Sequence, residues 1–291
     1  MKAYHISVLL QQTIEQLHVE SGKKYIDATV GGGGHSLEIV KRGGRVLGID
    51  QDHDAIAQCT ELFASYKDNI TLVQGNFEHI EEIAKAHDFT HIAGILYDLG
   101  ISSHHVDEGE RGFSFLQDAP LDMRMNQQTS VTAADLVNGL HKGELQELFE
   151  KYGEEHFAKR IAEEIIRVRE KGKITTTGEL AKIVARVYPG TVHKVHPATK
   201  VFQALRIAVN DELMVLQKSL PQALNLLQEK GRIVVISFHS LEDRIIKQTF
   251  LSWEQQNLGK VITKKPLVPS ELEIQENYRS RSSKLRVFEK Q

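Results

Sequence analysis

Short apolar runs alternate with helical patterns over the first hundred residues of the chain. The runs are rich in Val, Ile and Leu, and most of them end at Gly or Asp, which is typical of buried strands. The predicted strands are Lys24–Thr29, Arg45–Asp50, Asn69–Gln74 and Ile92–Asp98, and the predicted helices are His35–Lys41, Asp54–Tyr66 and His79–His87. Because strands and helices alternate, we expect an α/β fold with a parallel sheet and right-handed crossovers.

This alternation stops near residue 106, and the next hundred residues are almost entirely helical in pattern. The predicted helices of this segment are Ala133–Leu140, Glu154–Lys171 and Thr177–Val187. Strand pattern returns at Gly231–Phe238, between helical patterns around Glu212–Gln228 and Leu241–Trp253, and a last strand is predicted at Lys284–Phe288. We therefore expect an α/β domain formed by residues 1–105 and 211–291, with an all-helical domain, residues 106–210, inserted into it.

Composition narrows the class of protein. The 291 residues are 41% hydrophobic and 26% charged, as in ordinary soluble proteins, and the single cysteine excludes an internal disulfide or a thiolate metal cluster. No apolar run reaches the roughly 18 residues of a membrane span, and the first residues lack a signal-peptide pattern. We expect a cytoplasmic protein with no membrane partner and no metal. The net charge of -3 means that any nucleic-acid binding must depend on local basic patches.

The strongest chemical signal is a glycine turn between the first predicted strand and helix. Residues 31–34 are all glycine, so the backbone can come close to a ligand, and the helix that follows presents free N–H groups. Asp50 ends the second strand, 19 positions after Gly31, where a carboxylate typically holds ribose hydroxyls. Together these features predict a nucleotide-like ligand. A plain tight turn with a solvated Asp is the alternative.

The choice of ligand depends on two positions near this turn. Gly31 and Gly33 fit a dinucleotide fingerprint, but Ser36 occupies the position of its third glycine. Asp27, at the end of the first strand, favours S-adenosylmethionine (SAM), because a carboxylate suits its ammonium and sulfonium charges. The spacing of Asp27 from the glycines also resembles the motif of amino-group methyltransferases. Phe77 follows the third strand, where it could pack on an adenine ring or equally well in the core.

Asp98 ends the fourth strand, and in open α/β sheets the chemistry lies beyond the carboxyl ends of the strands. Enzymes that methylate exocyclic amines usually carry an Asp/Asn-Pro-Pro-aromatic motif at this place. This chain keeps the acid and replaces the remainder with Leu-Gly-Ile. The position of Asp98 in the sheet therefore supports amine methylation, and the absent prolines and aromatic weaken that interpretation.

A set of longer segments then occurs in order along nearly the whole chain. These segments are GGGGH (31–35), GIDQD (48–52), YDLGISS (97–103), ERGFSF (110–115), PLDMRM (120–125), YGEE..AKRIA (152–162), HPAT..FQALRI.VN (196–210), SFHSLEDR (237–244) and RSRSSKLR (279–286). The set resembles the bacterial ribosomal RNA small subunit methyltransferase H family, also called MraW. The resemblance implies a class I SAM-dependent methyltransferase with a Rossmann-like, mostly parallel sheet and an inserted all-helical domain for substrate recognition. It also implies methylation of the N4 amine of cytidine 1402 in 16S rRNA, in the decoding region of the small ribosomal subunit.

The resemblance also carries cofactor residues over to matching positions of this chain. With Asp27 and Gly31, which the residues themselves indicate, the predicted cofactor-binding set is Asp27, Gly31, Gly33, Gly34, His35, Asp50, Phe77, Asp98 and His105. His105 stands where members often have Gln, which would change the pH dependence of a hydrogen bond to SAM. The N-terminal segment His5–Leu10 matches the family, but Gln11 and Gln12 replace the acid that often follows it.

Cytosine can be methylated on carbon 5 or on N4, and the chain favours N4. Carbon-5 chemistry proceeds through a cysteine adduct, whereas Cys59 is predicted to lie within a helix as packed core. Direct attack of the N4 amine needs a hydrogen-bond acceptor that localises its lone pair and orients it. Asp98 is the predicted catalytic residue in this role. A backbone carbonyl at Leu99 or Gly100, or an Asp98 that contacts only SAM, are the alternatives.

RNA recognition is predicted from local features, because the target base must leave its stack to reach a buried methyl group. Basic residues gather in residues 186–206 and 278–290, where they would neutralise phosphates. The predicted substrate-binding residues are Phe113, Phe115, Lys194, Lys200, Arg206, His239, Arg279 and Arg281. Packing at a domain hinge is the alternative for the two phenylalanines, a solvated surface for the basic residues, and a structural hydrogen bond for His239. Ser240 with Asp243 is predicted to cap the last long helix.

Two other functions stay open on the sequence. One is an NAD-dependent enzyme, against which Ser36 and Asp27 argue. The other is an RNA-binding ribosome assembly factor that holds SAM without turnover, which the basic patches would serve equally well. A homodimer is compatible with the sequence, although no feature of the sequence indicates one.

Overall fold

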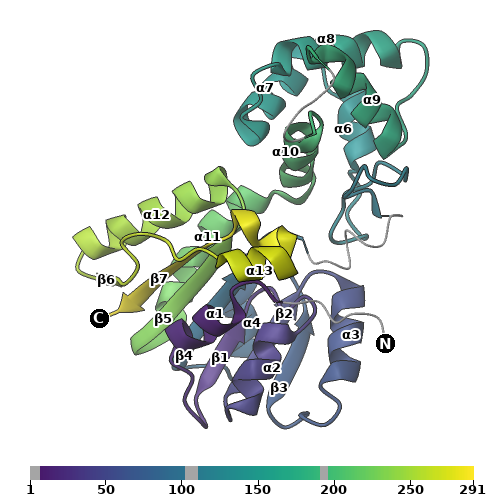
Figure 1. Cartoon of the computed structure of the whole chain (residues 1–291). Helices are drawn as coiled ribbons and strands as arrows, with labels where there is room; N and C mark the ends of the chain where they lie inside the picture. The colour runs from purple at the N-terminus through teal and green to yellow at the C-terminus, as the bar shows by residue number, and fades with distance from the viewer. Residues whose placement is uncertain (1–6, 102–110, 191–195) are drawn as a thin grey trace. The chain divides into compact units, whose positions relative to one another are not determined.

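The computed structural model describes residues 7–101, 111–190 and 196–291. The chain divides into two compact units. One, residues 1–100 and 213–291, contains the β-sheet and is called the sheet unit; the other, residues 101–212, is called the helical unit (Figure 1). The functions predicted for the two parts, cofactor binding and substrate recognition, stay predictions.

The sheet unit is built on seven strands in the order β3-β2-β1-β4-β5-β7-β6. The strands are β1 (Lys24–Asp27), β2 (Arg45–Asp50), β3 (Ile70–Gln74), β4 (Ile92–Asp98), β5 (Leu227–Ser237), β6 (Gly259–Val261) and β7 (Lys284–Lys290). The first five run parallel to one another, whereas β7 is antiparallel to both β5 and β6. This arrangement confirms the predicted α/β fold with a mostly parallel sheet.

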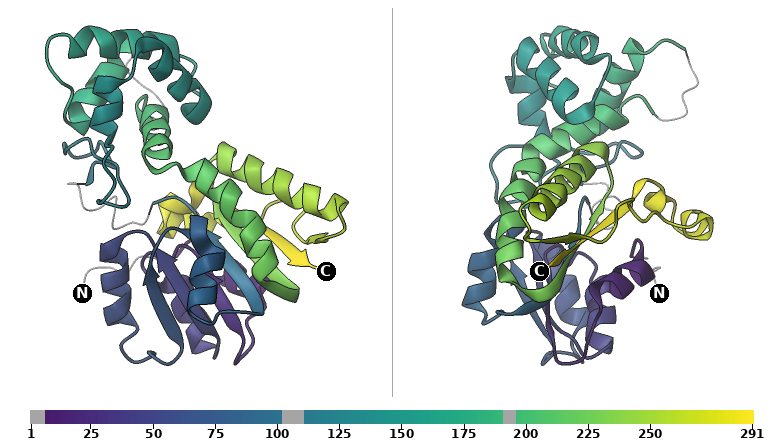
Figure 2. Two further views of the ribbon diagram at one scale, coloured as in Figure 1. Left: turned by 180° about the vertical axis from the view of Figure 1, so that it is seen from behind. Right: turned by 90° about the vertical axis from the view of Figure 1, so that its left-hand side faces the viewer.

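Helices cover both faces of this sheet. They are α1 (Leu10–Leu17), α2 (Gly34–Lys41), α3 (His53–Leu62), α4 (Ile80–Ala86), α11 (Glu212–Leu226), α12 (Ser240–Gln255) and α13 (Glu271–Glu276), with the short 3-10 helices η1 (Phe77–His79) and η3 (Tyr278–Ser282). Apolar residues of α1, α2 and α3 pack on one face, and those of α4, α11 and α12 pack on the other (Figures 1 and 2). Successive residues of β4 and β5 point into the two cores alternately, as a sheet buried on both faces requires.

The helical unit has its own hydrophobic core. Its helices are α6 (Ala133–Gly139), α7 (Lys142–Gly153), α8 (Ala158–Arg169), α9 (Thr177–Val187) and α10 (Thr199–Asn210). Apolar side chains from all five helices meet in this core, among them the fully buried Phe149, Ile165 and Val184. None of the helices in the described ranges of either unit has the length and apolar character needed to cross a lipid bilayer.

The predicted helix over residues 154–171 begins later than its pattern indicated. Glu154 adopts a left-handed conformation with φ of 48° and ends α7, so the chain changes direction before α8 begins at Ala158. The predicted ion pairing along this helix is present in part, because Arg167 pairs with Glu164 three residues earlier. The pattern also placed the start of β5 four residues late, since the strand begins directly after α11 at Leu227.

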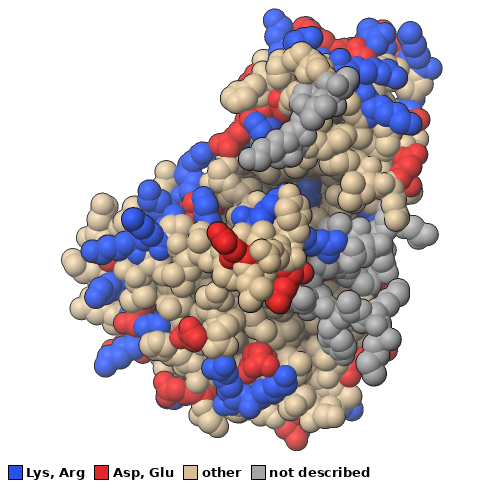
Figure 3. All heavy atoms as spheres, viewed as in Figure 1, with Lys and Arg blue, Asp and Glu red and all other residues tan. Residues whose placement is uncertain are grey.

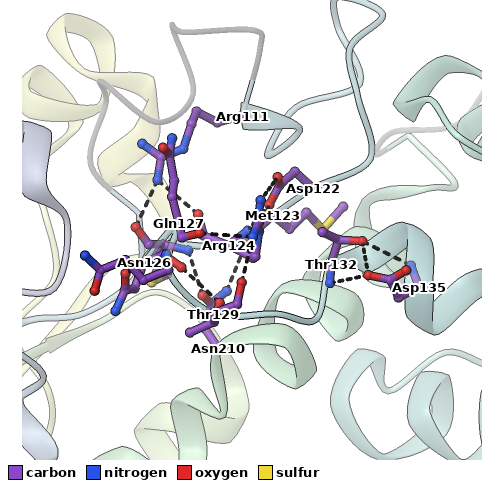
Figure 4. A network of polar contacts seen from close by, with 12 residues as sticks. Arg111, Asp122, Met123, Arg124, Asn126, Gln127, Thr129, Thr132, Asp135 and Asn210 are labelled. Atoms are coloured by element: carbon purple, nitrogen blue, oxygen red, sulfur yellow. Dashed lines mark hydrogen bonds and ion pairs between the residues drawn. The ribbon is translucent and has the colours of Figure 1, made fainter.

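The loop that precedes α6 is held by an arginine network (Figure 4). The guanidinium of Arg111, which is 7% exposed, donates to the carbonyl oxygens of Arg124 and Met125. Arg124 in turn makes a two-pronged contact with the carboxylate of Asp122. Asn210, at the end of α10, accepts from the backbone N–H of Met125. These bonds explain the polar residues of the PLDMRM segment as structural, since they fix its backbone to α10.

Asp243 joins α12 to β7. The prediction that it caps α12 together with Ser240 is wrong. Its carboxylate accepts from Arg286 Nε at 2.6 Å and from Lys284 Nζ at 3.1 Å. Burial raises the pKa of Asp243, but the hydrogen bonds from Arg286 and Lys284 outweigh it and hold the pKa below its ordinary value. The N-cap is His239, whose side chain accepts from the backbone N–H of Glu242. The carboxylate of Asp243 therefore pairs with two cations of β7 and not with the end of α12.

Replacing Asp243 by Ala should lower the free energy of unfolding of the sheet unit by about 3 kcal/mol, because it leaves the charge of Arg286 buried without a partner. Urea unfolding can be followed by the fluorescence of Trp253, the single tryptophan, which is buried in α12. Lys247→Ala changes an exposed side chain of the same helix and should shift stability by no more than about 0.5 kcal/mol. A loss below about 1 kcal/mol in the Asp243 variant would contradict this account.

Candidate functional site

Three carboxylates end neighbouring strands at one edge of the sheet. Asp27 ends β1, Asp50 ends β2 and Asp98 ends β4, and β1 pairs in parallel with both other strands. Because parallel strands share their carboxyl edge, the topology itself gathers these acids. The glycine turn follows β1 at the same edge.

Asp27 accepts hydrogen bonds from one residue on each side of the glycine turn. The residue is 1% exposed, and its carboxylate accepts from Ser36 Oγ at 2.7 Å and from the backbone N–H of Thr29 at 3.2 Å. Burial, together with the negative charge of Asp50, raises the pKa of Asp27 to about 6, although both hydrogen bonds act to lower it. Ser36, which the sequence showed only as a departure from the dinucleotide fingerprint, is therefore the hydroxyl donor to this acid.

Asp50 links the end of β2 to the glycine turn. One carboxylate oxygen accepts from the backbone N–H of Gly31 and the other from that of Asp52, both at 2.9 Å. Asp52 then caps α3 by accepting from the backbone N–H of Asp54. A carboxylate oxygen can accept more than one hydrogen bond, so these contacts orient Asp50 and leave acceptor capacity for a hydroxyl.

The glycine turn is packed so closely that side chains do not fit at its second half. A Cβ on Gly33, where φ is +77°, would lie 2.9 Å from side-chain carbons of Leu62 and Phe63. One on Gly34 would lie 2.1 Å from Ser7 Oγ. His35 lies in the first turn of α2, and its Nε2 lies 3.1 Å from the carbonyl oxygen of Val8. The turn is thus pressed between α3 and the segment before α1, which fixes its backbone.

Asp98 carries an acceptor without a partner. Its Oδ1 is buried and has no hydrogen bond within the described part of the chain, and its Oδ2 lies 3.6 Å from His35 Nδ1. Burial raises the pKa of Asp98 well above its ordinary value, and the negative charges of Asp27 and Glu242 raise it further. A cation beside these carboxylates would relieve that repulsion. The edge of the sheet is therefore arranged to attract a positively charged ligand.

Phe77 and His239, which the sequence predicted to contact the cofactor and the substrate, each contact another residue of the sheet unit. Phe77 is half-buried and packs edge-to-face on Tyr97, with ring centroids 5.5 Å apart. His239 follows β5, and its buried ring lies with Nε2 3.2 Å from Glu242 Oε1. The structural hydrogen bond that was the alternative for His239 is thus present, as the cap of α12. His105 lies outside the described residues.

The predicted substrate residues of the helical unit mostly have partners of their own. Phe115 packs on the ring of His196 at 4.5 Å and on that of Phe202 at 4.8 Å, and Phe113 also packs against the core of this unit. Lys200 Nζ donates to the carbonyl oxygen of Glu154. The guanidinium of Arg206 makes two bonds to the carboxylate of Glu212, which neutralises its charge. Lys194 lies outside the described residues.

The other predicted substrate residues, Arg279 and Arg281, lie in η3 of the sheet unit and are exposed. The assignment of these residues to RNA binding stays a prediction. The described members of the predicted cofactor set lie at or next to the carboxyl ends of β1, β2, β3 and β4, and the described members of the predicted substrate set are distributed over both units. Binding of the cofactor by these residues stays a prediction.

The strand order, the antiparallel β7 and the acidic glycine turn define a class I SAM-dependent methyltransferase fold. A family model of the MraW methylase family matches residues 2–291, and the chain belongs to this family. Membership in a methylase family rules out the NAD-dependent alternative.

Two relatives match over almost their whole length. The ribosomal RNA small subunit methyltransferase H of Symbiobacterium thermophilum is 45% identical over 310 residues, covering 100% of this chain and 98% of that protein. The protein of the same name from Brevibacillus brevis is 43% identical over 307 residues, covering 99% and 98%. Among solved structures, an rRNA methylase from Streptococcus thermophilus is 11% identical, with a TM-score of 0.46 over 100% of this chain and 98% of that one.

The residues at the sheet edge fit SAM, the cofactor of this class. The partnerless oxygen of Asp98 and the raised pKa values of Asp27 and Asp98 suit the ammonium and sulfonium charges of SAM. The glycine turn lies at the same edge, and the close packing of Gly33 and Gly34 against Leu62, Phe63 and Ser7 fixes its backbone. A phosphate, by contrast, would meet three like charges there.

Gly33→Ala should weaken SAM binding by at least about tenfold and destabilise the sheet unit, since it combines left-handed backbone with overlap against Leu62 and Phe63. Gly22→Ala is the matched control, because Gly22 has φ of +79° but nothing within 4 Å of its Cβ. It should show the backbone penalty of about 1–2 kcal/mol and keep normal SAM affinity. Calorimetry with SAM and thermal unfolding measure both effects, and equal SAM affinities in the two variants would disprove the role of the turn.

SAM affinity should rise with pH between about 5 and 7, following the pKa of Asp27 near 6. Below this pKa the carboxyl group of Asp27 is protonated and neutral, so a cationic ligand must displace the proton before it can interact with a negative charge. The affinity for SAM is therefore lower at low pH. Calorimetry in buffers of different ionisation enthalpy should therefore show proton release on binding. Asp27→Asn should flatten the pH dependence in this range, whereas Asp68→Asn, at an exposed acid before β3, should not. An unchanged pH profile in the Asp27 variant would contradict the assignment.

Proposed function

We propose that this protein transfers the methyl group of SAM to the N4 amine of cytidine 1402 in 16S rRNA of the small ribosomal subunit. Support for rRNA of the small subunit comes from relatives at 43–45% identity that carry this function in their names and match over full length. The particular nucleotide and atom come from the family resemblance of the sequence. A cytoplasmic protein acting on the ribosome is consistent with both.

The observation that carries the proposal is the buried, partnerless oxygen of Asp98 at the carboxyl edge. SAM, when bound, supplies an electrophilic methyl group on a positively charged sulfur. Transfer of this methyl group to an amine nitrogen would exchange a carbon–sulfur bond for a carbon–nitrogen bond and release one N–H proton, for which the carboxylate of Asp98 would be the acceptor. Asp98 Oδ1 can accept the hydrogen bond from this N–H group, which localises the nitrogen lone pair and aligns it with the methyl group.

The electrostatics of Asp98 suit such an acceptor. Its raised pKa, caused by burial and by the charges of Asp27 and Glu242, makes the ionised carboxylate a stronger base than an exposed aspartate. Its backbone N–H donates to Thr29 Oγ1 at 2.7 Å, which holds β4 against the start of the glycine turn. His35 lies beside the other carboxylate oxygen. These contacts position Asp98 and leave one oxygen for the substrate.

Methylation on N4 rather than carbon 5 is supported by the environment of Cys59. The thiol is fully buried under the glycine turn and donates to the carbonyl oxygen of Gly31 at 3.2 Å. Burial and the charges of Asp27 and Asp50 raise the pKa of Cys59 to about 12. A thiol in this state is not a nucleophile at neutral pH, and the chain has no other cysteine.

Small subunits from cells that lack the protein, incubated with labelled SAM, should gain one methyl group on N4 of cytidine 1402, as detected by mass spectrometry of nucleosides. Asp98→Ala and Asp98→Asn should reduce kcat at saturating SAM by about 100-fold or more, because the amine loses its acceptor. Asp68→Asn should leave kcat unchanged.

Three results would contradict this proposal. Near-normal turnover of the Asp98 variants at saturating SAM would eliminate the acceptor role. A methyl group on carbon 5 would overturn the target atom. SAM binding without incorporation would favour the alternative, an assembly factor that holds SAM without turnover.

A further inference from the structure

The short helix η3 exposes an aromatic side chain stacked with an arginine. Tyr278 is 67% exposed, although tyrosine is usually at least partly buried. The guanidinium carbon of Arg281 lies 4.2 Å from the centre of its ring, and Arg281 Nη1 also donates to the carbonyl oxygen of Tyr278. The arginine thus packs on the ring and keeps its orientation in solvent.

The backbone under this pair is fixed. Asn277 caps η3 by accepting from the backbone N–H of Arg279, and the buried Ser280 donates to the carbonyl oxygen of Asn277. Ser283, which is 1% exposed, ends the helix and donates its N–H to Ser280. Two buried serines therefore anchor a helix whose other side chains point outward, so the position of Tyr278 is set before any ligand arrives.

This helix lies at the same edge of the sheet as the acidic site. It runs directly into β7, whose first residue Lys284 pairs with Ser237 at the end of β5, and in β5 the preceding Ile236 is level with Asp98. The helix before it, α13, is bonded to the segment that covers the glycine turn, because Glu273 accepts from the backbone N–H of Leu9. A chain bound at η3 is therefore beside the site, not on the opposite edge.

The charge of η3 itself favours a polyanion. η3 contains two exposed arginines and no acid, and exposed Lys247 adds positive charge on α12, which begins at the same edge, whereas α13 before η3 carries Glu271, Glu273 and Glu276. Figure 3 shows Lys and Arg side chains gathered over α12. An exposed aromatic ring among cations is the combination with which proteins bind single-stranded nucleic acid, by stacking a base and neutralising its phosphates.

We propose that Tyr278 and Arg281 form a docking platform for an unpaired nucleotide of the RNA that lies beside the target cytidine. The base stacks on the ring of Tyr278, and Arg281 contacts a neighbouring phosphate while it supports the ring. This inference rests on the proposed function for the identity of the RNA, and it adds a binding site outside the site for SAM.

The test uses the full chain and a labelled single-stranded oligoribonucleotide of about 12 nucleotides, with dissociation constants measured by filter binding at several salt concentrations. Tyr278→Ala should raise Kd about tenfold, within the range measured for loss of one stacked base. Tyr278→Phe should stay within about twofold of wild type, because it keeps the ring. Arg281→Gln should reduce the slope of log Kd against log salt by about one unit.

Arg45→Gln is the matched control, because Arg45 is an exposed arginine at the amino end of β2, on the opposite edge of the sheet. In this variant Kd and the slope of log Kd against log salt should stay close to the wild-type values, because the charge removed lies far from η3. SAM affinity, measured in parallel, should equal that of wild type in every variant, which separates RNA docking from damage to the cofactor site.

Equal RNA affinities of wild type and Tyr278→Ala would overturn the platform, as would a Tyr278→Phe variant that binds as poorly as Tyr278→Ala. A Tyr278→Ala defect seen only with assembled subunits, and not with RNA alone, would also overturn it and indicate a protein partner. The proposed function fails separately: a wild-type protein that binds RNA through Tyr278 but leaves cytidine 1402 unmethylated would disprove the reaction and not the platform.

Discussion

The burial of negative charge at the end of a parallel sheet is the constraint on which this structure depends. Asp27 is almost fully buried between the two ends of the glycine turn. Asp98, on the second strand from that of Asp50, is half-buried and has one buried oxygen without a partner in the described part of the chain. Such an arrangement is costly without a counter-charge, because burial and mutual repulsion both disfavour ionised carboxylates. This unfavourable arrangement occurs at the edge where the sulfonium and ammonium groups of SAM would stabilise the ionised carboxylates by electrostatic attraction.

The remaining features of the sheet unit keep this edge rigid. Ser36 and Thr29 hold Asp27, Asp50 holds Gly31, and α3 closes against Gly33 from beneath. Further along the same edge, Asp243 joins α12 to β7. The helix η3 leads into β7 at Lys284, which pairs with Ser237 at the end of β5. A rigid frame of this kind is what a transfer reaction between two bound molecules needs, since its rate depends on alignment of the reacting atoms.

The sheet and the cofactor residues could be predicted because their signals are local. Apolar runs ending in Asp, with a run of glycines after the first, are visible in a few consecutive residues. Other features depend on partners distant in sequence: Ser36 is understood only beside Asp27, and Asp243 only beside Arg286. The cap formed by His239 was missed because histidine is an uncommon N-cap residue, and Glu154 because nothing in a helical pattern marks a left-handed residue. Tyr278 gave no signal, since exposure is a property of the fold.

The central claim is that the carboxyl edge holds a cationic methyl donor with an amine nitrogen in reach of Asp98. The most direct measurement is a crystal structure of the protein with SAM and a short RNA that contains the target cytidine. The account predicts that N4 lies within hydrogen-bond distance of Asp98 Oδ1 and in line with the bond from sulfur to the methyl carbon. A donor bound elsewhere, or an N4 group that approaches the methyl carbon while Asp98 points away from it, would contradict the account.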